Sequence, residues 1–203
     1  MIEKYIFDFG NVFINLDIEA TQRELQKWGL QSFTPEMERQ NHLYEKGLIS
    51  TAEFLAFYNK QIPQATPETL KTAWNKILLD FPLYRLEFLE AFSKEKDCIL
   101  LSNINEMHLE YIIDQLDDSF YKRFVNCFDK VYYTHEIHLR KPDKEIYNFV
   151  LKDLDCPPET CFFVDDKYEN IESARELGIT CWHIHPDKED IVQLHQKLKS
   201  TNR

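Results

Sequence analysis

Short, mostly apolar runs recur along the chain, and the pattern between them is helical. The runs lie at residues 4–7, 97–101, 130–133, 161–164 and 180–184, and a polar residue follows each one. Segments of this length that end at a polar residue are typical of buried strands. Two segments with a helical pattern of apolar residues, 144–151 and 170–177, lie between the later runs. Alternating strands and helices predict an α/β fold with a doubly wound parallel sheet that is covered on both faces.

The stretch from about residue 18 to residue 85 lacks such runs and carries helix signals instead. A helical pattern from Glu19 closes at Gly29, and Thr34-Pro35, Ser50-Thr51-Ala52-Glu53 and Thr66-Pro67 are typical helix starts. These signals predict a small helical bundle inserted after the first strand. We therefore expect an α/β core formed by residues 1–16 and 87–203, with a helical insertion formed by residues 17–86.

Composition narrows the class of protein and its partners. The 203 residues are 43% hydrophobic and 29% charged, which is typical of a globular domain with room for a modest insertion. A net charge of −11 argues against a nucleic-acid partner. Neither a signal peptide nor a membrane span is expected, and five cysteines without a C-x-x-C pair favour reduced thiols. We expect a cytoplasmic protein, either a monomer or a homodimer.

Polar residues that can do chemistry follow several of the predicted strands. They are Asp8, Ser102, Asn103, Lys141, Asp165 and Asp166. In doubly wound sheets the ligand crevice lies outside the carboxyl ends of the strands, so these side chains should converge. Carboxylates suit Mg²⁺, and a carboxylate can also attack phosphorus. A lysine and a hydroxyl would bind phosphoryl oxygens. The expected partner is a small-molecule phosphate ester, with Mg²⁺ as the cofactor.

Four segments carry a family resemblance. Residues Phe7–Val12, Leu100–Asn103, Arg140–Asp143 and Val164–Asn170 resemble, in order and spacing, the four motifs of the haloacid dehalogenase (HAD) superfamily. The helical insertion resembles the mobile helical cap of that superfamily. Gly-Asn-Val in the first motif, together with Ser-Asn in the second, resembles the branch that contains bacterial sugar-phosphate phosphatases such as α-glucose-1-phosphate phosphatase. The resemblance implies a HAD-type phosphatase acting on small phosphorylated metabolites.

The resemblance also implies catalytic roles. Asp8 would be the nucleophile that forms an aspartyl-phosphate, which water then hydrolyses. Ser102 and the backbone at Asn103 would bind the phosphate. Lys141 would neutralise the nucleophile and the transferring phosphoryl group.

Further roles concern the metal. The resemblance makes the carboxylates of Asp8 and Asp166 and the backbone carbonyl of Gly10 ligands of Mg²⁺. Asp165 would lie beside the metal, and Asn170 would hold a water molecule or the loop.

One position departs from the family pattern. Most phosphatases of the superfamily carry an Asp two residues after the nucleophile, where it protonates the leaving group, and here that position is Gly10. Loss of acid–base help costs roughly 10²–10⁴-fold in rate, least for esters with good leaving groups. A catalytically weak regulatory module that binds a phosphorylated ligand is therefore one alternative. A 2-haloacid dehalogenase is another, but the pair Asp165-Asp166 argues against it because dehalogenation needs no magnesium.

Overall fold

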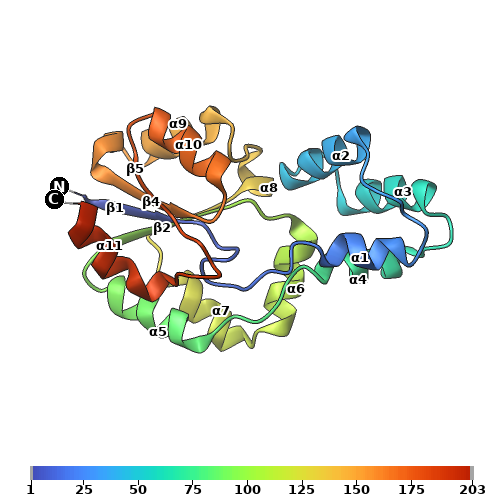
Figure 1. Cartoon of the computed structure of the whole chain (residues 1–203), viewed down its shortest axis with the longest axis horizontal. Coiled ribbons are helices and arrows are strands. Elements are labelled where there is room, and N and C mark those ends of the chain that lie inside the picture. Colours follow the sequence, from blue (N-terminus) through green and yellow to red (C-terminus); the bar gives the residue numbers. More distant parts are fainter. Residues whose placement is uncertain (1, 202–203) are drawn as a thin grey trace.

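The computed structural model describes residues 2–201, and its centre is a five-stranded parallel sheet (Figure 1). The strands are β1 Lys4–Phe7, β2 Asp97–Ser102, β3 Lys130–Tyr133, β4 Cys161–Asp165 and β5 Thr180–His183. Their order is β3-β2-β1-β4-β5, so β1 is central and pairs in parallel with both β2 and β4. The carboxyl ends of the strands point toward the helical insertion, while the amino end of β1 and the last described residues of the chain lie at the opposite side.

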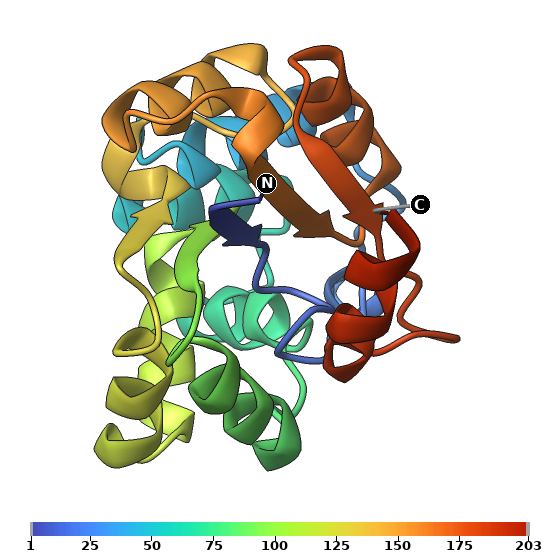
Figure 2. The ribbon, with the colours of Figure 1, turned by 90° about the vertical axis from the view of Figure 1, so that its left-hand side faces the viewer.

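Helices cover both faces of the sheet and form the insertion. Their bounds are α1 Ala20–Gln26, α2 Pro35–Glu45, α3 Thr51–Gln61, α4 Pro67–Asn75, α5 Leu83–Phe92, α6 Glu106–Gln115, α7 Asp118–Val125, α8 Thr134–Ile137, α9 Lys144–Asp153, α10 Tyr168–Glu176 and α11 Leu194–Thr201, with short 3-10 helices η1 Pro158–Thr160 and η2 Ile191–Gln193. Helices α5, α7 and α11 lie on one face of the sheet, and α9 and α10 on the other (Figures 1 and 2). The predicted doubly wound fold is confirmed.

Side-chain alternation along the strands explains why both faces are covered. In β1, Tyr5 and Phe7 join one apolar cluster and Ile6 joins the other. In β4, Phe162 and Phe163 divide in the same way. Because successive side chains of a strand point to opposite faces, a strand that is apolar throughout needs a helix layer on each side.

The inserted helices α1–α4, called the cap below, have an apolar core of their own. Leu25, Phe54, Tyr58 and Leu70 are buried there together with Trp74. The predicted helix starts are confirmed: the hydroxyls of the residues at 34, 50 and 66 each accept a hydrogen bond from a backbone N–H of the following helix.

Two linkers join the cap to the core and lie side by side. The Asn15 backbone N–H donates to the Asp80 carbonyl at 2.9 Å, and the Asp17 N–H donates to the Ile77 carbonyl at 2.9 Å. Helix α5, which follows the second linker, packs against the sheet through Leu86 and Leu89. The division at residue 86 falls within this helix and stays a prediction.

The cap also contacts the core directly. An ion pair joins Lys46 to Asp143 at 2.9 Å, and another joins Glu45 to Arg140 at 3.0 Å. The turn at Gly47 has a positive φ of 62°, where glycine is favoured. These contacts hold the end of α2 against the loop that carries Lys141. Among residues 2–201, no helix is long and apolar enough to cross a membrane.

Candidate active site

Three carboxylates meet at the carboxyl ends of the two central strands. Asp8 follows β1, Asp165 ends β4, and Asp166 is the next residue. The register of β1 and β4 pairs Phe7 with Val164, so the residues that follow them are neighbours. One oxygen from each of the three carboxylates lies within 4.8 Å of the others. Three negative charges this close need cations to offset their repulsion.

Lys141 supplies one of these cations. Its Nζ donates to Asp8 Oδ1 at 2.7 Å and to Asp165 Oδ2 at 2.6 Å, and its side chain is buried. Burial lowers the pKa of Lys141, but attraction to Asp165 and Asp8 outweighs burial, so its pKa is raised above the ordinary value. The ammonium is therefore fixed in its charged form between the two carboxylates.

Asn103 holds the backbone of this lysine. Its Nδ2 donates to the Lys141 carbonyl at 2.9 Å, and its Oδ1 accepts from the Lys141 N–H at 3.0 Å. The side chain thus ties the end of β2 to the loop that carries Lys141, and so places the ammonium.

The two adjacent carboxylates have different surroundings. Asp165 accepts from Lys141, from the Lys167 backbone N–H at 2.8 Å, and from Asn170 Nδ2 at 3.0 Å to each oxygen. Four hydrogen bonds from three donor groups fill the lone-pair positions that a carboxylate offers. Asp166 Oδ2 accepts only from Asn11 Nδ2, at 2.8 Å, among the described residues. Asp166 therefore keeps coordination capacity that Asp165 has lost.

The pKa of Asp8 shows the electrostatic cost of this arrangement. Burial raises it to about 7; Lys141 opposes the shift, and the neighbouring carboxylates Asp165 and Asp166 add to it. The pKa of Asp166 is also raised, mainly by burial, while the hydrogen bond from Asn11 opposes the shift. A divalent cation would favour the ionised form of both groups.

Asn11 completes the site from the turn after β1. Its backbone has a positive φ of 55°, a conformation that asparagine tolerates better than most residues. While Nδ2 holds Asp166, Oδ1 accepts from the Leu16 N–H at 3.0 Å. On the far side of Asp166, its carbonyl accepts from His183 Nε2 at 2.9 Å. The loop with Asp166 is thus held from two strand ends.

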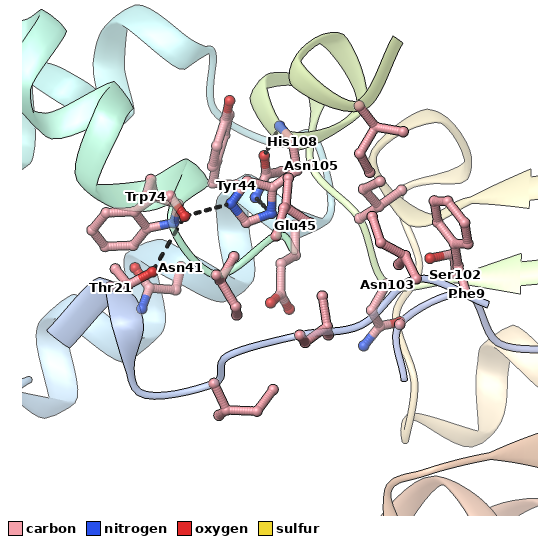
Figure 3. Close-up of a pocket in the computed structure, with 18 of the residues that line it drawn as sticks. Phe9, Thr21, Asn41, Tyr44, Glu45, Trp74, Ser102, Asn103, Asn105 and His108 are labelled. Carbon is pink, nitrogen blue, oxygen red and sulfur yellow. Dashed lines mark hydrogen bonds between the residues drawn. The ribbon is translucent and has the colours of Figure 1, made fainter. Parts of the chain in front are cut away.

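A cavity of about 240 Å³ runs from this site into the cap (Figure 3). At the core end it is lined by Gly10, Ser102, Asn103 and Lys167, and its other walls come from the cap and the linkers. Gly10 follows Asp8 by two residues and Lys167 follows Asp166 directly, so the carboxylates adjoin the core end of a cavity whose far end is formed by cap residues.

A family model for haloacid dehalogenase-like hydrolases matches residues 6–178. The chain belongs to this family. It is 28% identical over 188 residues to a D-ribitol-5-phosphate phosphatase of Bacteroides thetaiotaomicron, with 88% of this chain and 89% of the relative covered. It is 30% identical over 202 residues to a drimenol cyclase of Aspergillus calidoustus, covering 95% of this chain but only 35% of that protein.

A solved structure is similar to this HAD-like hydrolase in both fold and sequence. The HAD-family enzyme of Bacteroides thetaiotaomicron in complex with magnesium and inorganic phosphate superposes with a TM-score of 0.81 at 30% identity, covering 96% of this chain and 99% of that one. The expected family and fold are therefore confirmed.

The donor set of this HAD-like hydrolase fits Mg²⁺. Mg²⁺ prefers oxygen ligands and takes one or two carboxylates while keeping several water molecules. Asp8 and Asp166 each have an oxygen without a hydrogen-bond partner among the described residues, and the Gly10 carbonyl follows Asp8 closely in the chain. Asp165 is committed to Lys141 and Asn170, and its place beside the metal stays a prediction.

The structure thus brings all the predicted site residues to one end of the sheet. The Asn170 amide donates to Asp165, at the start of the loop that follows β4, and its role toward a water molecule stays a prediction. The sequence interpretation did not identify Asn11, Lys167 or the polar cap residues as part of the site. The only local signal for a special role of Asn11 was its position directly after Gly10, since glycine and asparagine favour turns with positive φ.

Proposed function

We propose that the protein is a magnesium-dependent phosphatase of small phosphate monoesters that works through an aspartyl-phosphate on Asp8. The observation that carries the proposal is the position of Asp8: its carboxylate is held by buried Lys141 at the end of the sheet where Gly10 and Ser102 line the cavity. A carboxylate so placed can attack phosphorus, and the fixed ammonium offsets charge on the nucleophile and on the phosphoryl oxygens.

The reaction would proceed by two displacements. A carboxylate oxygen of Asp8 bonds to phosphorus while the ester oxygen leaves, and water then attacks phosphorus and releases Asp8. Ser102 and the backbone at Asn103 would bind the phosphoryl oxygens. Magnesium, held by Asp8, Asp166 and the Gly10 carbonyl, would supply charge neutralisation at the phosphate.

Because residue 10 is a glycine, this position offers no side chain that could protonate the leaving group. A Cβ added at this residue would lie 2.7 Å from Leu16 Cδ1, so the end of the flexible Leu16 side chain would have to move to admit an acid here. The proton would then come from water or from the substrate itself. Glycosyl 1-phosphates and aryl phosphates, whose leaving groups need the proton least, should be hydrolysed faster than simple alkyl phosphates.

We further propose that the substrates are sugar phosphates and that the cap, within residues 17–86, selects the leaving group. The D-ribitol-5-phosphate phosphatase relative supports the class, and the cavity between cap and core supports the selecting role. A cytoplasmic location is part of the proposal and rests on the five free thiols.

A screen of phosphorylated metabolites tests this function. Release of inorganic phosphate should require Mg²⁺ and should be lost in Asp8→Asn. The control Asp187→Asn changes an exposed carboxylate and should retain full activity. Binding of inorganic phosphate without hydrolysis of any ester would contradict the proposal and favour the regulatory alternative that Gly10 suggests.

A further inference from the structure

The cavity that reaches the catalytic end of the sheet is mostly apolar, with a few polar side chains at its far end. Its apolar lining includes Leu16, Phe33, Trp74 and Leu78. With a volume of about 240 Å³, it is smaller than the roughly 300–1,000 Å³ of pockets for drug-sized ligands. It therefore suits a leaving group of metabolite size.

Two polar side chains of α2 face this cavity from adjacent turns of the helix. Asn41 and Glu45 are four residues apart, a spacing that places them on the same helix face. In Figure 3 the carboxylate of Glu45 points into the space between the cap and the core, with Asn41 beside Thr21 on the cap side and Ser102 and Asn103 on the core side.

In each of these two side chains, one polar atom is hydrogen-bonded to protein and the other polar atom is available to a ligand. Tyr58 donates its hydroxyl to Asn41 Oδ1 at 2.6 Å, which fixes the amide so that Nδ2 is free to donate. Arg140 donates to Glu45 Oε2 at 3.0 Å, which leaves Oε1 free to accept. Among the described residues neither Asn41 Nδ2 nor Glu45 Oε1 has a hydrogen-bond partner.

Three other polar side chains at this end, those of Thr21, Asn105 and His108, are already paired with protein. His108 Nε2 lies 3.2 Å from the Trp74 carbonyl, to which it donates, and Thr21 donates to the same carbonyl at 3.2 Å. Asn105 Nδ2 lies 3.2 Å from His108 Nδ1 and donates to it in this tautomer. A ligand in the cavity would therefore find its hydrogen-bond partners at Asn41 and Glu45.

We propose that Asn41 and Glu45 determine substrate specificity by binding hydroxyl groups of the leaving group, so that the preferred substrates are phosphate esters of neutral polyhydroxy compounds. The inference rests on the proposed phosphatase function and names the substrate class of that site. An amide N–H₂ only donates and a carboxylate only accepts, and a hydroxyl, or two neighbouring hydroxyls, satisfies both. The aromatic walls at Phe33 and Trp74 cover the C–H faces of the same molecule.

Other leaving groups fit this chemistry less well. An apolar alcohol would leave the amide and the carboxylate desolvated and unpaired. A leaving group with a second anionic group would meet the free oxygen of Glu45. The name of one relative, drimenol cyclase, indicates terpenoid chemistry. A preference for esters of apolar alcohols is therefore the alternative that the test has to distinguish.

Two esters of equal chain length separate these classes. Sorbitol 6-phosphate and n-hexyl phosphate share a six-carbon primary phosphate ester and differ in their hydroxyl groups. The wild-type kcat/KM should favour the sorbitol ester by about 10-fold or more, and Asn41→Leu and Glu45→Gln should each reduce this ratio about 10–100-fold. The loss should be confined to the sorbitol ester, and turnover of n-hexyl phosphate should rise in Asn41→Leu, because no amide is then left unpaired beside an apolar alcohol.

Lys46→Ala is the matched control, because it removes a neighbouring cap–core ion pair with Asp143 and its side chain does not line the cavity. The ratio should stay at the wild-type value. If Asn41→Leu fails to fold, Asn41→Ala replaces it, since a water molecule can then pair with the hydroxyl of Tyr58.

The outcomes separate this inference from the proposed function. A wild-type preference for n-hexyl phosphate, an unchanged ratio in the variants, or an equal loss on both esters would overturn the specificity role while leaving the phosphatase intact. Absence of Mg²⁺-dependent hydrolysis of every ester would overturn the function. Calorimetric binding of the two esters to Asp8→Asn with Mg²⁺ would then still decide whether hydroxyl groups are recognised.

Discussion

Asp8 should destabilise the metal-free protein, and Asp8→Asn should relieve that cost. The pKa of Asp8 is raised by burial to about 7, from 3.8. Between these two values the folded protein keeps the proton that the unfolded chain has lost, so stability falls as pH rises through this window. Below about pH 4 both states are protonated and the cost vanishes; above about pH 7 the full cost is present.

The magnitude follows from the same shift. One pKa unit corresponds to about 1.4 kcal/mol, so the two pH units from about 5 to about 7 correspond to about 3 kcal/mol. Asparagine has nearly the shape of the protonated acid and carries no charge. The advantage of Asp8→Asn in free energy of unfolding should therefore grow by about 2–3 kcal/mol between pH 5 and pH 8, which is about 5–10 °C in Tm.

Thermal unfolding with EDTA at several pH values measures this growth, with Asp187→Asn as a control that should follow the wild type. Saturating Mg²⁺ should raise the Tm of the wild type more than that of Asp8→Asn, because the variant lacks one carboxylate ligand. An advantage that is absent, or that is constant from pH 5 to pH 8, would refute the assignment of a buried, strained charge to Asp8.

Three further substitutions test separate parts of the account. Gly10→Asp introduces a carboxyl where the general acid is missing, and it should raise kcat on an alkyl phosphate by about 10-fold or more relative to an aryl phosphate; equal effects on both esters would argue against a missing acid. Asn103→Ala removes both hydrogen bonds to the Lys141 backbone, and urea unfolding should show a loss of about 1–3 kcal/mol, together with lower kcat. Gly47→Ala puts a Cβ 2.0 Å from the His135 carbonyl oxygen at a positive φ, and calorimetric unfolding should show a loss of more than about 1–2 kcal/mol; wild-type stability would contradict the close contact of cap and core there.

The sequence predicted the parts of the site that follow from topology. Asp8 and Asp165 each come directly after an apolar run or close one, and parallel pairing of β1 with β4 brings such ends together without further information. Lys141 was harder to place from pattern alone, since it lies in a loop outside any strand. Its pairing with the nucleophile came only from the family resemblance, and the ion pairs with Asp8 and Asp165 give that pairing a physical basis.

What the sequence did not predict depends on contacts between distant segments. Asn11 binds Asp166 across 155 positions of sequence, and Glu45 binds Arg140 across 95. No local spacing reports such contacts. Helix α5 was also not predicted, because its apolar residues, such as Leu86 and Phe88, lie on several sides of the helix and give no amphipathic period.

Detection of a phosphoryl group on Asp8 during turnover tests the central claim most directly. The wild type would be mixed with p-nitrophenyl phosphate and Mg²⁺, quenched in acid within the first turnover, and its peptides examined by mass spectrometry. The account predicts a phosphorylated peptide that contains Asp8, absent without Mg²⁺ and absent in Asp8→Asn. Rapid hydrolysis that persists in Asp8→Asn, or a phosphoryl group on another residue, would contradict it.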